Sequence, residues 1–271
     1  MTDASIGNAA VVDALDGELR AAGTPERAAG SKAYLKSDLE FYGNTVPELR
    51  AAVRALRREH PDMTREDVLD VAGRLWVRPV FERRLLAIHL LEAHVRLLTA
   101  DDLGLLERWV RLGRMWALVD NLSGDVAGPL LDRLGEPVAT TVLDAWAADG
   151  DVWVRRSALL AHARSLRAGG GDFDRFARYA DAMLEEREFW IRKAIGWVLR
   201  DMSRGAGGRP GVVFEWLLPR AHRASGVTLR EAVKYLSPEQ RAAVLEASGR
   251  KPGKSSGKSS GKVRSRTRSS G

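Results

Sequence analysis

Apolar residues recur at helical spacing along most of the chain. Val11, Val12, Leu15 and Leu19 form the first such stripe, since residues three and four apart share one face of an α-helix. Residues 1–38 are predicted to form two helices, separated at Gly23-Thr24-Pro25, and residues 40–44 a loop. Further helices are predicted near residues 45–60, 64–77, 79–97, 100–112, 115–134, 137–148, 151–167, 173–187, 188–204, 210–222 and 228–247. No stretch alternates with the period of a β-strand, so the sequence predicts an all-α protein.

Three of these helices have N-capping patterns at their predicted starts. The patterns are Thr-x-x-Glu at residues 45–48 and 228–231, and Ser-Pro-x-Gln at residues 237–240. A capping Ser or Thr accepts a hydrogen bond from the backbone amide three residues on, and the Glu or Gln side chain there bonds back to the cap. We therefore expect helices to begin at these positions.

Four aromatic residues mark an internal repeat. Phe81, Trp116, Trp153 and Trp190 are separated by 35, 37 and 37 residues. Three of them open similar segments, Phe-Glu-Arg-Arg, Trp-Val-Arg-Arg and Trp-Ile-Arg-Lys, each followed by Leu or Ala at helical spacing. Helix pairs that repeat with a period near ~40 residues are typical of HEAT-type proteins. The sequence therefore predicts a solenoid of HEAT-like repeats with a curved, concave face.

The charge is unevenly distributed along the chain. The 271 residues include 43 Lys and Arg against 36 Asp and Glu, but residues 249–271 hold eight of the basic residues and no acidic one. The remaining 35 basic and 36 acidic residues leave the body nearly neutral, so any basic groove there requires local clustering. The Gly-Lys-Ser-Ser repeats of the end cannot form a core. We expect a repeat domain over residues 1–248 and a disordered basic tail over residues 249–271.

Several classes of protein are disfavoured by the composition. There is no cysteine, no N-terminal secretion signal, and no apolar run near the roughly 18 residues that a membrane span requires. His89 and His94 are five residues apart, off a common helical face, and we find no Gly-rich phosphate loop and no nucleophile elbow. We expect a monomer in a bacterial cytoplasm, associated with the nucleoid, with no cofactor and no metal.

One helical stripe carries candidate chemistry. Trp116 and Asp120 are four residues apart, so they share a helix face. Counted from the opening aromatic of each repeat, Arg156 and Lys193 stand at position +3 and Trp197 at +7. Stacked repeats bring equivalent positions side by side, so these five residues are predicted to line one wall. A lone carboxylate beside aromatic faces can stabilise a developing cation.

Four segments, in order and with their spacing kept, resemble the AlkD family of DNA alkylation repair glycosylases over residues 8–247. They are Tyr-Leu-Lys-Ser-Asp-Leu-Glu-Phe-Tyr-Gly from Tyr34, with Pro-Glu-Leu-Arg after it, then Trp116-Ala-Leu-Val-Asp120, Trp153-Val-Arg-Arg156 and Lys193-Ala-Ile-Gly-Trp197-Val-Leu-Arg-Asp. That family is built of HEAT-like repeats and excises positively charged N3- and N7-alkylated purines from DNA.

The resemblance implies a role for each matching residue. Asp120 would be the catalytic carboxylate, and Trp116 and Trp197 the aromatic walls at the lesion. The implied DNA contacts are Arg156 at a backbone phosphate, Tyr34 at the N-terminal end of the groove, and Lys193. The family often has Asp directly after the first Trp, where this chain has Ala117, so the rate or the substrate range could differ. Hydrolysis of the N-glycosidic bond of double-stranded DNA that carries alkylated purines is the expected activity, with an abasic site as product.

Other interpretations compete with this one. The protein could be a HEAT-like DNA-binding protein without catalysis, a protein-binding scaffold, or a bifunctional lyase that uses Lys193 as an amine nucleophile. Asp120 could simply cap a helix, and Arg156 could pair with an acid between repeats, as Arg155 is expected to do. Trp153 and Trp190 are expected in the core. A methyl adduct and a bulky adduct are both open as the natural lesion.

Overall fold

The computed structural model describes residues 3–205 and 207–249, and these form helices without a β-strand, apart from one isolated bridge between Glu40 and Val80. The all-α prediction is confirmed. The predicted tail lies outside the described residues except for Gly249, so the proposed domain boundary stays a prediction.

The α-helices are α1 (Asp3–Ala22), α2 (Pro25–Leu35), α3 (Val46–Glu59), α4 (Arg65–Val77), α5 (Phe81–Ala93), α6 (Leu103–Gly113), α7 (Trp116–Asn121), α8 (Gly128–Leu134), α9 (Val138–Ala147), α10 (Val152–Leu160), α11 (Ala163–Arg167), α12 (Phe173–Ala182), α13 (Phe189–Met202), α14 (Pro210–Leu217), α15 (Gly226–Ala232) and α16 (Pro238–Ala247).

Two of the three predicted N-caps are confirmed. Thr45 and Ser237 each form a complete capping box, at α3 and α16. The third prediction is wrong, because the cap of α15 is Ser225, whose Oγ accepts from the Thr228 amide at 3.1 Å. The single helix predicted over residues 228–247 is also wrong. It is divided before Pro238, since a proline forces the preceding residue into an extended conformation.

The helix predicted over residues 115–134 is interrupted by a π-helical turn, η2 (Leu122–Ala127), between α7 and α8. The amide of Gly128 donates to the Ser123 carbonyl, five residues back. The Ser123 hydroxyl donates to the Val119 carbonyl at 2.6 Å. A Cβ on Gly128 would lie 2.2 Å from the Ala161 carbonyl oxygen, so this glycine permits close packing against the end of α10. Such turns are frequent at functional sites.

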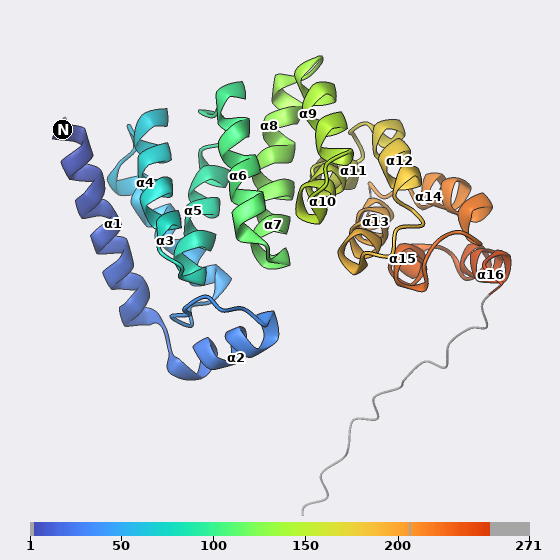
Figure 1. Ribbon diagram of the computed structural model, residues 1–271, viewed down its shortest axis with the longest axis horizontal. Helices are drawn as coiled ribbons and strands as arrows, with labels where there is room; N and C mark the ends of the chain where they lie inside the picture. Colours follow the sequence, from blue (N-terminus) through green and yellow to red (C-terminus); the bar gives the residue numbers. More distant parts are fainter. Residues whose placement is uncertain (1–2, 206, 250–271) are drawn as a thin grey trace, which may run out of the picture.

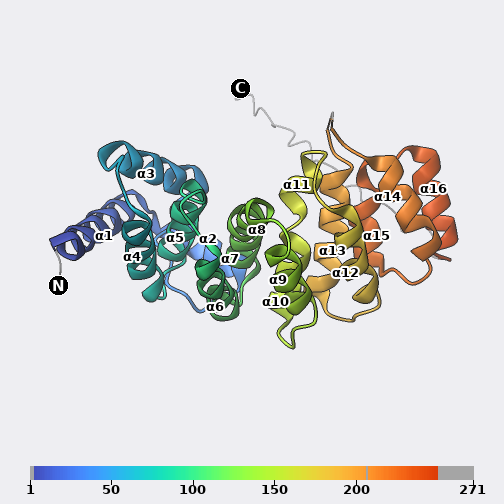
Figure 2. The ribbon, with the colours of Figure 1, turned by 90° about the horizontal axis from the view of Figure 1, so that it is seen from above.

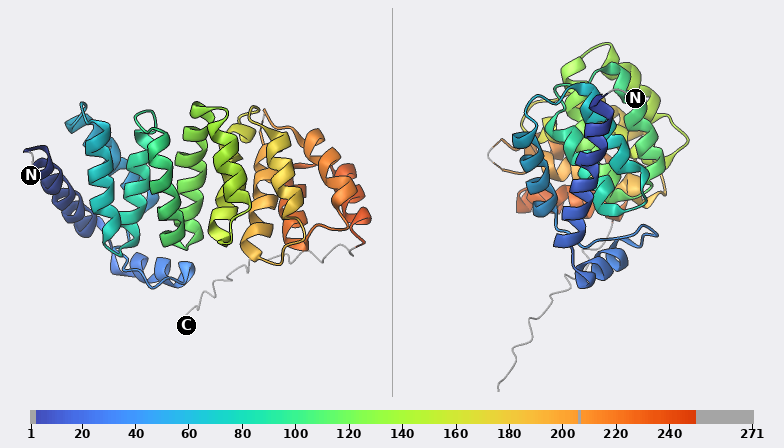
Figure 3. Two further views of the ribbon diagram at one scale, coloured as in Figure 1. Left: turned by 45° about the horizontal axis from the view of Figure 1, so that its top comes forward. Right: turned by 90° about the vertical axis from the view of Figure 1, so that its left-hand side faces the viewer.

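The helices are stacked in an arched array with two layers, which Figures 1 and 2 show from the side and from above. We call one layer the inner row. It consists of α3, α5, α7–η2–α8, α10–α11, α13 and α15, in which each helix contacts the next. Helix α2 crosses beneath the ends of α5 and α7, outside the stack (Figure 3). The four aromatics of the predicted repeat lie at the first or second residue of α5, α7, α10 and α13, as expected for equivalent helices of successive repeats.

Ion pairs connect each repeat to the next along the array. Arg155 pairs with Glu186 at 3.0 Å, as predicted. Pairs with partners 36 to 38 residues apart, one repeat, are Arg65–Asp102, Arg111–Asp149, Asp120–Arg156 and Lys193–Glu231. These pairs form a ladder, and they fix the register of neighbouring repeats.

Gly196 of α13 packs closely against α15. A Cβ there would lie 2.7 Å from the Thr228 carbonyl oxygen and 2.8 Å from the Glu231 Cβ. We expect Gly196→Ala to lower the free energy of unfolding by about 1–3 kcal/mol, because backbone would have to move. Gly73→Ala on α4, where a Cβ meets nothing within 4 Å, should instead raise it by about 0.4–1 kcal/mol. Urea denaturation tests both, and equal effects would contradict this packing argument.

Candidate active site and nucleic-acid interface

The structure brings Trp116, Asp120 and Trp197 to one cavity of about 560 Å³. Trp116 and Asp120 come from α7 and Trp197 from α13, with α10 and α11 between them. The helical spacing within α7 places the Trp116 ring and the Asp120 carboxylate on one face. The cavity therefore has two indole walls and a carboxylate, the groups that the sequence predicted for it. Their catalytic role stays a prediction.

Arg156 holds Asp120 from behind. Its Nε and Nη2 each donate to one carboxylate oxygen of Asp120, both at 2.7 Å. The Nη1 group donates to the Trp190 carbonyl oxygen, and only 1% of Arg156 is exposed. The sequence predicted a contact of Arg156 with backbone phosphate. In this structure its guanidinium instead faces a carboxylate inside the protein.

This pairing fixes both the charge and the orientation of Asp120. Burial raises the pKa of the Asp120 carboxyl, and the Arg156 guanidinium opposes that rise. Both oxygens of Asp120 accept from the Arg156 guanidinium, which is the bonding pattern of an ionised carboxylate. The Asp120 side chain is 11% exposed and lines the cavity. A fixed anion of this kind suits electrostatic stabilisation of a cation.

Tyr34 lies at a second cavity, of about 740 Å³, which shares Trp116 with the first. Tyr34 is 74% exposed at the end of α2, and its ring meets Trp116 edge-on at 5.9 Å between centroids. Trp153 and Trp190 also line this second cavity, with their ring centroids 5.4 Å apart. The predicted core position is confirmed for Trp153, which is buried, but Trp190 is partly exposed. Trp116 thus separates two adjoining hollows.

Lys193 belongs to a charge cluster beneath Trp197. Its Nζ lies 2.5 Å from a carboxylate oxygen of Glu231. Burial works to raise the pKa of Glu231, but hydrogen bonds from Lys193, Lys234 and Arg200 outweigh it and lower the pKa to about 2. The Arg200 guanidinium lies 4.9 Å from the centre of the Trp197 ring. Lys193 therefore connects α13, the helix that carries Trp197, to Glu231 on α15. An ammonium group held in an ion pair is a poor candidate for an amine nucleophile.

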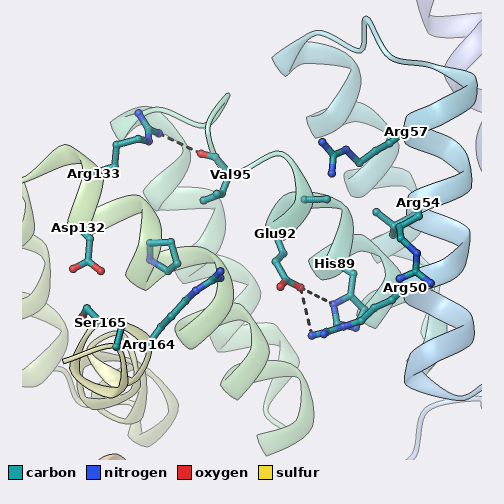
Figure 4. A pocket seen from close by; sticks show the side chains of 14 residues that line it. Arg50, Arg54, Arg57, His89, Glu92, Val95, Asp132, Arg133, Arg164 and Ser165 are labelled. Carbon is teal, nitrogen blue, oxygen red and sulfur yellow. Dashed lines mark hydrogen bonds and ion pairs between the residues drawn. The ribbon is translucent and has the colours of Figure 1, made fainter. Parts of the chain in front are cut away.

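A basic groove adjoins the Asp120 cavity along the inner row (Figure 4). Figure 4 shows arginines of α3 on one side and of α8 and α11 on the other. Arg164 lines both the groove and the Asp120 cavity, so the two lie side by side. The acidic residues of the groove are Glu92 and Asp132, and the five arginines are Arg50, Arg54, Arg57, Arg133 and Arg164.

Sequence reasoning missed this groove. Arg50, Arg54 and Arg57 have the spacing of a single helix face, which could have indicated it. The arginines of α8 and α11 carry no such pattern, because only the stacking of repeats brings them near α3. Clustered arginines along one surface are typical of contacts with nucleic-acid phosphates.

Neither a metal-binding cluster nor a membrane-spanning helix is found in the described part of the chain. Among residues 3–205 and 207–249, no three His, Cys, Asp or Glu side chains are grouped to hold a metal ion. Within the same ranges, no helix combines the length and the apolar character that crossing a bilayer requires.

Comparison with known proteins places these features in a family. The family model described as DNA alkylation repair enzyme matches residues 15–236. A predicted DNA alkylation repair enzyme from Enterococcus faecalis is 25% identical, with a TM-score of 0.69, over 80% of this chain and 97% of that one. AlkD2 from Streptococcus mutans shares the fold at 18% identity, with a TM-score of 0.54, over 78% of this chain and 99% of that one. No protein of curated function matches the sequence significantly. The chain therefore belongs to the DNA alkylation repair enzyme family, which gives it a role in alkylation repair with DNA as its partner.

Proposed function

We propose that the protein is a monofunctional DNA glycosylase that hydrolyses the N-glycosidic bond of cationic N3- and N7-alkylated purines. The observation that carries the proposal is the Asp120 carboxylate, held by Arg156 at the wall of a cavity between Trp116 and Trp197. One chain supplies all of these side chains, and we propose that the enzyme acts as a monomer.

The proposed chemistry needs an anion more than it needs an acid. An N3- or N7-alkylated purine is already positively charged and leaves with the electrons of the glycosidic bond. Positive charge then develops on the deoxyribose. Asp120 would face that charge, and the Trp116 and Trp197 rings would add their negative π faces. Because Arg156 fixes both carboxylate oxygens, little reorganisation would be needed as the bond breaks.

The groove would hold the duplex beside the lesion. Its five arginines face two acids, so it has the excess positive charge that phosphate contacts require. Lys193 and Tyr34 stay proposed DNA contacts at the two ends of the site. The predicted basic tail would add phosphate affinity without reading sequence or lesion. A protein scaffold has no need of this groove, and salt-dependent binding of duplex DNA would count against that alternative.

One observation favours the alternative of a DNA-binding protein without catalysis. The Asp120–Arg156 pair has the same one-repeat spacing as the other pairs of the ladder, so it could be structural only. The retained indole walls and the partly exposed carboxylate favour catalysis. Activity decides between the two interpretations.

The test is single-turnover excision from a duplex with one 7-methylguanine, followed by cleavage of abasic sites. We expect release of 7-methylguanine, and only poor release of uracil or 8-oxoguanine from matched duplexes, because a neutral base must be protonated to leave and the carboxylates act as anions in the proposed mechanism. Borohydride should trap no covalent adduct, which would exclude the lyase alternative. Binding of the alkylated duplex without release of its base would contradict the glycosylase proposal and support a DNA-binding protein without catalysis. Release of uracil at the rate of 7-methylguanine would require another mechanism.

A further inference from the structure

A second carboxylate, that of Asp125, lines the cavity of Trp116, Asp120 and Trp197. It is partly exposed. Within the described residues, no hydrogen bond or close ion pair engages it, whereas both oxygens of Asp120 are bound by Arg156. Asp201 also lines the cavity and accepts from Arg200. Of the three carboxylates at the cavity, Asp125 is therefore the one whose oxygens have no hydrogen bond among the described residues.

The π-helical turn η2 explains how both carboxylates reach one cavity. Asp125 follows Asp120 by five residues. In an uninterrupted α-helix this spacing turns the second side chain about 140° away from the first. In η2 each hydrogen bond spans five residues instead of four, so a turn contains more residues and the angle between the two side chains is smaller. The wider turn therefore brings Asp125 toward the face of Asp120, and both residues line the cavity.

We infer that Asp125 is the general base of the reaction, which removes a proton from the water that attacks C1′ while Asp120 stabilises the sugar cation. This inference rests on the proposed glycosylase function. The glycosidic C1′–N bond breaks with its electron pair going to the purine, which leaves as a neutral alkylated base. The water oxygen bonds to C1′, one water proton goes to Asp125 and later to solvent, and an abasic deoxyribose remains.

The surroundings of Asp125 suit a base better than those of Asp120. Burial raises the pKa of Asp125 and Glu92 adds to the rise, while Arg164, Arg50 and His89 lower it. A carboxylate with a raised pKa is a stronger base, and neither oxygen has a hydrogen bond to break first. The other charged groups at the cavity are Asp120 on α7, Arg164 and Arg167 on α11, and Asp201 on α13, which accepts from Arg200.

The test is Asp125→Asn, measured by single-turnover excision of 7-methylguanine at saturating enzyme across pH. The wild-type rate should fall as pH falls and protonates the base. In the variant we expect the rate at neutral pH to drop on the order of a hundredfold and that dependence to flatten. Asp174→Asn, which removes the same charge from an exposed site on α12, should keep both the rate and the profile.

Thermal unfolding separates this role from a structural one. The folded-state pKa of Asp125 is raised, so its ionisation destabilises the folded protein above that pKa. Asp125→Asn should therefore not lower the melting temperature at neutral pH. A lower melting temperature together with a lower rate would make Asp125 structural and overturn the inference.

The two proposals fail in different ways. A wild-type protein that releases no base refutes the glycosylase proposal itself. A wild-type protein that excises 7-methylguanine, with Asp125→Asn unchanged in rate and profile, refutes only the role of Asp125.

Discussion

Asp120→Asn is expected to lower the single-turnover rate of 7-methylguanine excision by about a hundredfold or more. The change removes the negative charge and keeps the volume, and one oriented charge at a developing cation is worth on the order of 3 kcal/mol. Affinity for the alkylated duplex should change little, because the arginines of the groove are untouched. Rates are measured at saturating enzyme, below the melting temperature of the variant.

The matched control for this variant is Asp102→Asn. Asp102 is also buried and also paired to one arginine through both oxygens, by Arg65 at 3.0 and 2.6 Å. It stands in the same ladder but does not line the cavity of Asp120. We expect Asp102→Asn to lose stability and keep its excision rate. Equal rate losses in the two variants would reduce Asp120 to a structural partner.

Arg156→Leu is expected to lower the free energy of unfolding by about 3–5 kcal/mol, because it leaves the Asp120 carboxylate buried without a partner. The loss should depend on pH. Without Arg156, burial alone acts on Asp120 and raises its folded-state pKa further above the unfolded value. Stability then falls as pH rises toward that pKa and recovers as pH falls below it.

Urea denaturation at mildly acidic and mildly alkaline pH tests this expectation. The loss of unfolding free energy in Arg156→Leu should be smaller at acidic pH. Adding Asp120→Asn should recover part of this loss at alkaline pH, because the double variant has no charge buried at this pair. A loss that is independent of pH and of Asp120 would mean that Arg156 acts through packing or through its bond to the Trp190 carbonyl.

The repeat and its main groups were predictable from sequence because they depend on local periodicity. Trp116 and Asp120 share a helix face by spacing alone, and the aromatic period places Trp197 in an equivalent helix. Asp125 could not be found this way. A projection with 3.6 residues per turn places Asp125 away from the helix face of Asp120. The π-helical turn brings it closer to that face, and this turn ends where Gly128 packs against Ala161.

The error at α15 has a similar origin. Ser225 and Thr228 are both good capping residues, and only Thr228 has a Glu three residues later, the pattern of a capping box. The structure uses the Thr228 hydroxyl to donate to the Arg192 carbonyl of α13 at 3.1 Å, which leaves Ser225 as the cap. Arg156 shows the same limit, since its helical position was predictable but its partner, 36 residues away, depends on how repeats stack.

The ladder of ion pairs has a mechanical consequence for catalysis. A stack of repeats has contacts only between neighbours, so its bending depends on a series of separate joints. The two indole walls stand on α7 and α13, two repeats apart, with Arg156 on the repeat between them. The width between the walls is therefore set by two successive joints, one of which the Asp120–Arg156 pair itself closes. We therefore expect the pair that orients the carboxylate also to restrict bending between α7 and α10, so that a change in the curvature of the solenoid would change the distance between the two indole walls.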